Sequence, residues 1–189
     1  MAGWRKLSRD APPLFGAATL TLLSLAAFFC NPRLAKAADQ PLEYQVKAAF
    51  LLNFTKFIEW PAETASTASP VDICILGDDP FGPVLDQMVA GETLQGRKIE
   101  VVRVKRQPPS SCAVLFIGRS EKDVDSLLSM LGPGVLTVSE KTSFLHAGGI
   151  IEFAVENHKV KFDINQTAAA KARLQISSKL LNIARSVEK

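Results

Sequence analysis

The segment Val71-Asp-Ile-Cys-Ile-Leu-Gly-Asp-Asp-Pro80 decides the fold class. Its first six residues are apolar except for one aspartate, which predicts a buried strand over 71–76. Gly77 and the two aspartates then turn the chain, and we expect Asp79 to cap a helix whose first residue is Pro80. A buried strand that turns directly into a helix is typical of an α/β protein.

The rest of the chain continues this alternation of strands and helices. Apolar runs and period-two patterns predict strands over 98–104, 113–117, 135–138, 151–155 and 160–164. The last two form a hairpin that turns at Glu156-Asn157-His158. Because the hairpin adds an antiparallel pair to strands that alternate with helices, the sheet should be mixed.

Helices are predicted where apolar residues recur at helical spacing behind a capping residue. The first spans 42–58, a second follows a capping box of Ser120 and Asp123, and Asn165 and Ser177 cap two more near the C-terminus. We therefore expect a single-domain α/β sandwich over 38–189, with a mixed sheet of roughly six strands flanked by helices.

The helix predicted over 42–58 is apolar around most of its circumference, whereas a surface helix needs only one apolar stripe. It should therefore be covered on more than one side. Its aromatic residues Phe50, Phe54 and Phe57 would then contact either the core of the domain or a second subunit, and both interpretations stay open. The second interpretation predicts a homodimer.

Composition excludes several classes of protein. With 47% hydrophobic and 22% charged residues, the chain of 189 residues suits a packed globular domain. The net charge of +3 is unevenly distributed, because residues 1–37 hold five basic residues and one acidic residue. The remainder has 17 basic and 18 acidic residues, a net charge of −1 that does not favour nucleic acid as a partner.

Residues 1–37 have the organisation of a secretory signal peptide. Basic residues precede an uncharged, mostly apolar run of 16 residues over 14–29, and Ala35-Lys36-Ala37 supplies small residues for cleavage. The run is shorter than the ~20 residues of a membrane-spanning helix. We expect cleavage before Ala38 and a periplasmic location, with Cys30 removed together with the signal.

Cys74 and Cys112 would be the two cysteines of the mature chain. In an oxidising compartment, two thiols of a small exported domain most often pair, so we favour a disulfide. The alternative is two buried free thiols that pack as small apolar residues.

The sequence lacks the patterns that carry enzyme chemistry. Two histidines, His146 and His158, stand without neighbouring ligand types at zinc spacing, so we expect no metal. GxSxG, GxGxxG and phosphate-loop patterns are missing, so we expect no cofactor and no enzyme activity. The residues point to an exported binding or regulatory domain.

Several segments together resemble the YfiR family of bacterial periplasmic proteins. The first is Tyr44-Gln-Val-Lys-Ala-Ala-Phe-Leu-Leu-Asn-Phe-Thr-Lys-Phe-Ile-Glu-Trp-Pro61. The others, in order, are Ile75-Leu-Gly-Asp-Asp-Pro-Phe81, Leu94-Gln-Gly-Arg-Lys-Ile99, Cys112-Ala-Val-Leu-Phe-Ile117, Val135-Leu-Thr-Val-Ser139, Gly148-Gly-Ile-Ile-Glu-Phe153, Val160-Lys-Phe-Asp-Ile-Asn165 and Ile176-Ser-Ser-Lys-Leu-Leu181. The resemblance covers essentially all of the mature chain.

The resemblance implies regulation by protein–protein contact. Proteins of this family resemble periplasmic repressors that hold an inner-membrane diguanylate cyclase inactive, which lowers cyclic-di-GMP and biofilm formation. It further implies an α/β domain that dimerises, an outer-membrane lipoprotein that sequesters the repressor, and paired cysteines at Cys74 and Cys112. The alternative function is a periplasmic small-ligand sensor that serves another membrane receptor or kinase.

A partner-binding surface is predicted on the C-terminal hairpin. Strand alternation places Lys161 and Asp163 on the face opposite the apolar residues Val160, Phe162 and Ile164. Polar groups at the edge of an interface suit reversible binding, so we expect Lys161, Asp163 and Arg185 to contact the partner. Reversing Asp163 to Lys should then weaken partner capture and leave the thermal midpoint nearly unchanged.

Overall fold

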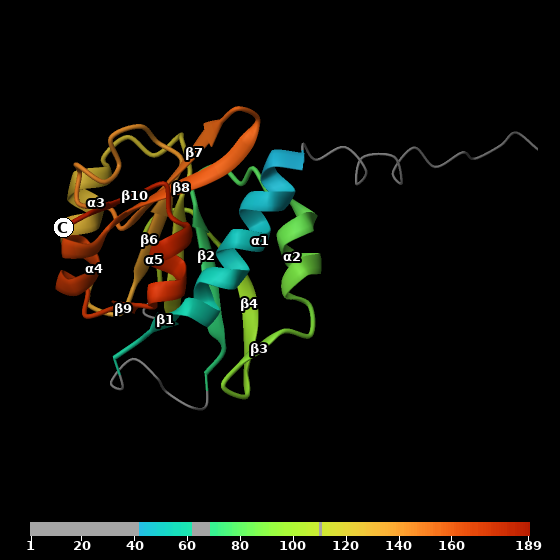
Figure 1. Ribbon diagram of the computed structural model, residues 1–189. Helices are drawn as coiled ribbons and strands as arrows, with labels where there is room; N and C mark the ends of the chain where they lie inside the picture. The colour runs from blue at the N-terminus through green and yellow to red at the C-terminus, as the bar shows by residue number, and fades with distance from the viewer. Residues whose placement is uncertain (1–41, 62–68, 110) are drawn as a thin grey trace, which may run out of the picture. The chain divides into compact units, whose positions relative to one another are not determined.

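The structure is a computed structural model that describes residues 42–61, 69–109 and 111–189 (Figure 1). The predicted signal peptide over 1–37 and its cleavage site before Ala38 lie outside these residues. The described residues form two sheets and five helices.

The main sheet has eight strands in the order β10-β8-β7-β6-β5-β2-β4-β3. Their bounds are β2 (Val71–Leu76), β3 (Thr93–Leu94), β4 (Arg97–Val104), β5 (Cys112–Ile117), β6 (Leu136–Ser139), β7 (Ile151–Glu156), β8 (Lys159–Asn165) and β10 (Ser186–Glu188). The five adjacent strands β4, β2, β5, β6 and β7 pair in parallel. Strand β3 pairs antiparallel with β4, and β8 pairs antiparallel with β7. The predicted α/β fold with a mixed sheet is confirmed.

The sheet has two strands more than the roughly six that a pattern of strands and helices predicts. The additional strands are β3 and β10, which have two and three residues and lie at the two edges of the sheet. A separate small sheet joins β1 (Ile58–Glu59) to β9 (Gln175–Ile176) in antiparallel pairing. Strands this short are held by their neighbours and leave little periodicity in the sequence.

The helices are α1 (Leu42–Phe57), α2 (Pro83–Val89), α3 (Val124–Met130), α4 (Gln166–Lys171) and α5 (Ser178–Ile183). Two predicted caps are confirmed, because Asn165 accepts from the Ala168 N–H at 2.8 Å and Ser177 from the Leu180 N–H at 3.4 Å.

Two predicted helix starts are wrong. Helix α2 begins at Pro83 rather than Pro80, because the Asp79 carboxylate accepts from the N–H groups of Phe81 and Gly82 and forms a turn ahead of the helix. Helix α3 is capped by Asp123 alone, since Ser120 bonds elsewhere.

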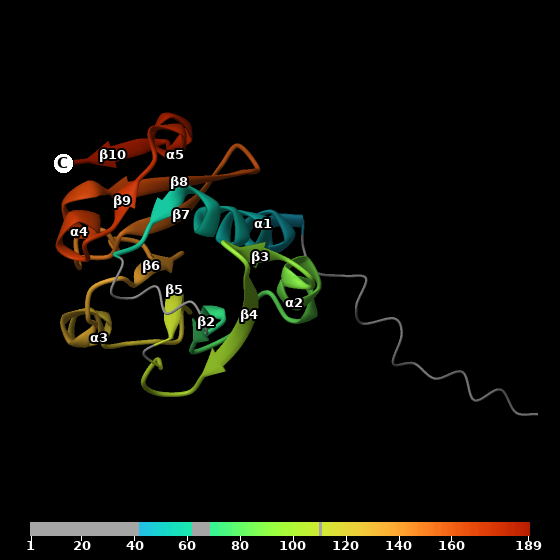
Figure 2. The same ribbon diagram turned by 90° about the horizontal axis from the view of Figure 1, so that it is seen from below.

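The main sheet has an apolar core on each side. Helices α1 and α2 cover one face over β2, β5 and β7, and α3 covers the other face over β2 and β5 (Figure 2). Side chains of β2 alternate between the cores, with Ile73 and Ile75 toward α1 and Cys74 and Leu76 toward α3. A strand buried on both faces explains the nearly continuous apolar run of β2.

Cys74 and Cys112 form a disulfide on the α3 side, with their Cα atoms 5.8 Å apart. The bond links the neighbouring strands β2 and β5 beside an irregularity in their register between Asp72 and Ile73. The predicted pairing is confirmed, and the alternative of two free thiols is wrong. Both cysteines are buried.

Candidate functional site

Two of the three phenylalanines of α1, Phe50 and Phe54, lie against the C-terminal hairpin of β7 and β8. Phe54 is fully buried, and its ring centroid lies 5.9 Å from that of Phe153 and 5.3 Å from that of Phe162. Phe50 is half-buried and stacks beside Phe54 at 5.9 Å, while Phe57 packs on the edge of the same core. These contacts are with the domain's own core.

Asp163 and Arg185, two of the residues predicted to bind a partner, form an ion pair. The Arg185 Nε donates to Asp163 Oδ1 at 2.9 Å, and its Nη2 donates to Oδ2. The Ser186 hydroxyl donates to the same carboxylate at 2.7 Å. Because β10 pairs in parallel with β8 and places Ser186 opposite Asp163, the carboxylate fastens the C-terminal strand to the sheet.

Asp163 is therefore not the exposed residue that strand alternation predicts. It is 5% exposed, because Arg185 and Ser186 cover it from the neighbouring strand. Burial disfavours the ionised carboxylate, but the hydrogen bonds from Arg185 and Ser186 outweigh this effect and lower the pKa of Asp163. The same bond raises the pKa of Arg185. Reversing the charge of Asp163 would repel Arg185 inside a buried pair, so it should destabilise the domain.

Lys161 lies on the same face of β8 as Asp163, opposite Ala154 of β7. This face, which we call the polar hairpin face, consists of Glu152, Glu156, Lys159, Lys161 and Asp163, with Arg185 beside it. Lys159 and Glu156 stand opposite each other and carry opposite charges. The three residues predicted to bind a partner, Lys161, Asp163 and Arg185, therefore lie close together. Asp163 is buried and holds Arg185 by hydrogen bonds.

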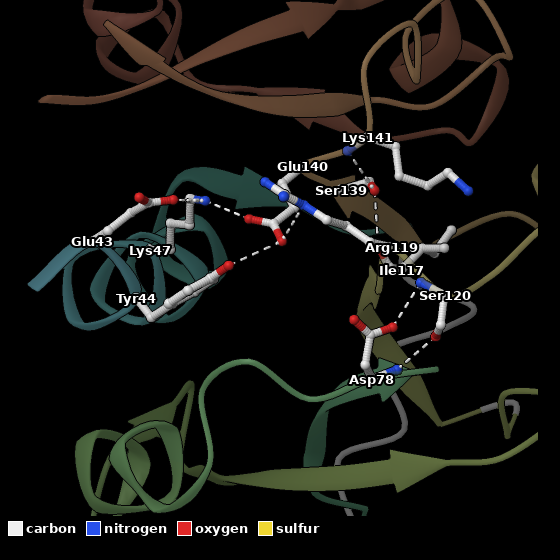
Figure 3. Close-up of polar contacts among 10 residues, drawn as sticks. All are labelled: Glu43, Tyr44, Lys47, Asp78, Ile117, Arg119, Ser120, Ser139, Glu140 and Lys141. Carbon is white, nitrogen blue, oxygen red and sulfur yellow. Dashed lines mark hydrogen bonds and ion pairs between the residues drawn. The ribbon is translucent and has the colours of Figure 1, made fainter. Parts of the chain in front are cut away.

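A second polar cluster, which is not among the predicted site residues, gathers around Glu140 just after β6 (Figure 3). Glu140 is 4% exposed by its side chain, and Lys47 of α1, 1% exposed, forms an ion pair with it and with Glu43. The Tyr44 hydroxyl donates to Glu140 at 3.3 Å, and Arg119 forms an ion pair with it at 2.9 Å. This junction holds the first turns of α1 against the strand ends.

The electrostatics of the Glu140 junction suit a structural role. Burial raises the pKa of Tyr44, and the negative charge of Glu140 raises it further. The carboxylate of Glu140 receives donors on both oxygens, from Tyr44 and Arg119 on one and from Lys47 on the other. A buried carboxylate whose two oxygens both receive donors is fully satisfied, as buried polar groups in folded proteins normally are.

The loops that follow β2 and β5 meet at the same edge of the sheet. The Asp78 N–H donates to the Ser120 hydroxyl at 3.0 Å, and the Ser120 N–H donates to the Asp78 carboxylate at 2.7 Å (Figure 3). These bonds with Ser120 lower the pKa of Asp78. A side chain at Gly118 would have its Cβ 2.6 Å from the Asp78 carbonyl oxygen, so the loops require glycine there.

This edge is the point at which ligands bind in many open α/β sheets. The chain leaves β2 toward α2 and β4 and leaves β5 toward α3 and β6, so the connections diverge from two adjacent strands. Here Asp78 and Ser120 satisfy each other across that point. Within the described ranges, no group of three or more His, Cys, Asp or Glu residues could hold a metal ion.

The sequence matches the family model described as YfiR/HmsC-like over residues 44–185. This chain belongs to the YfiR/HmsC-like family. The match includes all of α1 except its first two residues, Glu140 with its partners Tyr44, Lys47 and Arg119, the polar hairpin face and the disulfide, and it ends at Arg185. The resemblance that the sequence motifs predict is confirmed.

The YfiR/HmsC-like family consists of regulatory rather than catalytic proteins and suggests a periplasmic regulator of cyclic-di-GMP signalling. No curated protein matches this chain significantly. Among solved structures, it is similar to a conserved domain protein from Vibrio cholerae, with a TM-score of 0.47 and 11% identity. That similarity covers 77% of this chain and 60% of the Vibrio chain.

In this YfiR/HmsC-like chain, one signal could have revealed the Glu140 junction. Lys47 lies among apolar residues of a helix that is predicted to be covered on several sides, and a buried lysine needs a carboxylate partner. The sequence does not say which of many carboxylates supplies the charge.

No described helix is both long and apolar enough to cross a membrane.

Proposed function

We propose that the protein is a periplasmic repressor that binds an inner-membrane diguanylate cyclase and holds it inactive, which lowers cyclic-di-GMP and biofilm formation. Membership of the YfiR/HmsC-like family over residues 44–185 carries this proposal. Repression of this kind needs no chemistry in the repressor. It requires only that the repressor bind the inactive conformation of its target more tightly than the active one.

The polar hairpin face is the surface we propose for the contact. Lys161 is half-buried and Arg185 is exposed, so both can offer positive charge to a partner. The Asp163 carboxylate accepts two hydrogen bonds from Arg185 and thereby fixes the direction of its guanidinium group. Charged groups at an interface edge mainly control the association rate and the choice of partner, which suits a contact that must be released.

Two further contacts belong to the proposal. An outer-membrane lipoprotein would sequester the repressor and thereby release the cyclase. The repressor itself would be a homodimer, for which light scattering of the purified protein at several concentrations gives the mass. A mass that stays at one subunit throughout would exclude the dimer.

The decisive experiment is a pull-down from detergent-solubilised membranes with the exported protein as bait, followed by mass spectrometry. Capture of a diguanylate cyclase is the expected result. Lys161→Glu should reduce capture, and the matched control Lys98→Glu makes the same charge change on β4, in the other half of the sheet. Equal capture of the cyclase by both variants would show that Lys161 is not part of the contact surface.

Deletion of the gene tests the function independently of the surface. Cyclic-di-GMP should rise in the deletion strain and return to its original level when the gene is restored. An unchanged level would overturn the repressor function even if the bait captured a membrane protein.

A further inference from the structure

The connection between β4 and β5 is unusually short for two parallel strands of one sheet. Such connections commonly need about a dozen residues or more and usually contain a helix that covers the sheet. Here only the seven residues 105–111 lead from the end of β4 to the start of β5, past β2 (Figure 2). The described part of this segment contains no helix. The face of the sheet opposite α1 is therefore covered mainly by α3.

A groove of about 700 Å³ lies between this connection and α3. One wall is Arg106-Gln107-Pro108-Pro109, and the opposite wall is the C-terminal half of α3 with the residues that follow it. Its lining is mostly apolar and consists of Arg106, Gln107, Pro108, Pro109, Cys112, Leu127, Met130, Leu131, Gly132, Pro133 and Val135. Met130 is 66% exposed, although methionine side chains are normally well buried.

Charge in the groove has one sign. Arg106 is exposed, and among the described residues of the lining it is the only one with an ionisable side chain. An adjoining pocket of about 450 Å³, beside α4, contains both Asp125 and Lys171 and therefore offers no comparable preference. An apolar surface with a single cation at its edge complements a molecule with an apolar body and one anionic group.

We propose that this groove binds a small amphiphilic anion, such as a medium-chain or aromatic carboxylic acid. The apolar body would cover Leu127, Met130 and Val135, where a crossover helix would otherwise contribute side chains. The carboxylate would face Arg106. The volume of about 700 Å³ falls within the range of about 300–1,000 Å³ that is typical of small-molecule sites.

A small molecule fits the groove better than a partner protein does. A stable protein interface buries about 800 Å² on each partner. Exposed large apolar residues on the described surface are few, and the others, Leu42, Val155 and Ile183, belong to other elements. Binding at the groove is also separate from the polar hairpin face, so it can be measured without the cyclase.

Oxidation of methionine by hydrogen peroxide gives a direct test with an internal control. The chain has three methionines, of which Met1 lies in the predicted signal, Met130 lines the groove and Met88 packs against the core on the α1 side. Decanoate below its micellar concentration should slow sulfoxide formation at Met130 and leave Met88 unchanged, as measured by peptide mass spectrometry. Acetate, which lacks an apolar body, and decyltrimethylammonium, which has the opposite charge, should protect less.

Two substitutions locate the site. A Cβ at Gly132 would have no atom within 4 Å, so Gly132→Leu should fold normally, fill the groove and abolish the protection of Met130. Arg106→Glu should weaken decanoate binding about fivefold or more, because it replaces an attraction of up to about 1 kcal/mol with a repulsion. Lys105→Glu makes the same charge change one residue away, outside the lining, and should bind decanoate nearly as tightly as the original protein does.

The proposal fails if decanoate does not protect Met130, or if it protects Met88 equally, which would show a general effect on the fold. It fails also if Gly132→Leu retains protection while circular dichroism shows a native fold. Equal protection by decanoate and the cationic amphiphile would overturn the role of Arg106. None of these results bears on whether the protein represses a cyclase.

Discussion

The two halves of the main sheet bury their strands differently. In the parallel half, every residue of β2 and β6 is buried, because helices and loops cover both faces. In the hairpin half, β7 and β8 alternate, with Phe153 and Phe162 toward α1 and Glu152 and Lys161 on the polar hairpin face. The first half is therefore constrained by packing on both sides, whereas the second can change one face with little effect on the core.

The largest expected difference between the halves comes from truncating an apolar side chain. Phe116 of β5 is fully buried, and its ring centroid lies 4.8 Å from that of Phe81. Phe116→Ala should lower the free energy of unfolding by about 3–5 kcal/mol. Val155→Ala, at a position of β7 that is half exposed, should cost less than about 1 kcal/mol. Urea denaturation followed by circular dichroism measures both, and equal losses would contradict the comparison.

The disulfide is the next largest contribution, and it belongs to the parallel half alone. Replacing both Cys74 and Cys112 with serine should lower the free energy of unfolding by about 2–4 kcal/mol, because the unfolded chain regains freedom and two hydroxyls enter the core. Peptide mapping without reductant should first show that the two cysteines are linked in the native protein. Alkylation of both thiols in the native protein would contradict the bond.

The Asp163–Arg185 pair should give a smaller effect with a defined pH dependence. Asp163→Asn should cost about 1–3 kcal/mol at pH 7, because a charged acceptor of two side chains is lost. Since the folded-state pKa of Asp163 is lowered from its ordinary value of 3.8, its contribution is present above that value and is lost as the pH falls through the lowered pKa.

Urea denaturation of both proteins at pH 7 and near pH 2 tests this sign. The difference in stability between the original protein and Asp163→Asn should shrink in acid. A difference that stays constant or grows would show that the carboxylate is not stabilised by Arg185 in the folded state. Asp78 and Asp86, whose pKa values are also lowered, are present in both proteins and cancel in the comparison.

The smallest effect is expected on the polar hairpin face. Among the described residues, Lys161 has no carboxylate partner comparable to the one that Asp163 provides for Arg185. Lys161→Glu should therefore change the free energy of unfolding by less than about 0.5 kcal/mol. A thermal melt checks this result. A loss of several kcal/mol would show that this face is as constrained as the parallel half.

The parts of the fold that the sequence predicts also differ between the two halves of the sheet. Strands β2 and β5 are predictable because burial on both faces requires apolar runs, and the hairpin is predictable because one apolar face requires alternation. The caps Asn165 and Ser177 are local and are also predicted. By contrast, the edge strands β3 and β10 are too short for a pattern, and their pairing depends on neighbours distant in sequence.

The candidate site is less predictable than the fold. Alternation correctly places Asp163 away from the apolar core, but it does not reveal that Arg185 and Ser186 return to cover it. Likewise, Glu140 receives donors from α1 and from the loop after β5, which meet only in the folded chain. A polar group's exposure depends on these distant segments, and periodicity contains no information about them.

The pairing of β1 with β9 has a consequence for the order of folding. Ile58, which directly follows the first helix, pairs with Ile176, and Phe54 of that helix packs against Phe162. The earliest described segment therefore completes its contacts with segments near the C-terminus. Contacts between residues so distant in sequence slow folding. A chain that emerges from the ribosome at about 5–20 residues per second therefore lacks the partners of α1 until synthesis is almost finished. Such a delay would suit the export that we propose for this protein, because an exported chain must stay unfolded until it has crossed the membrane.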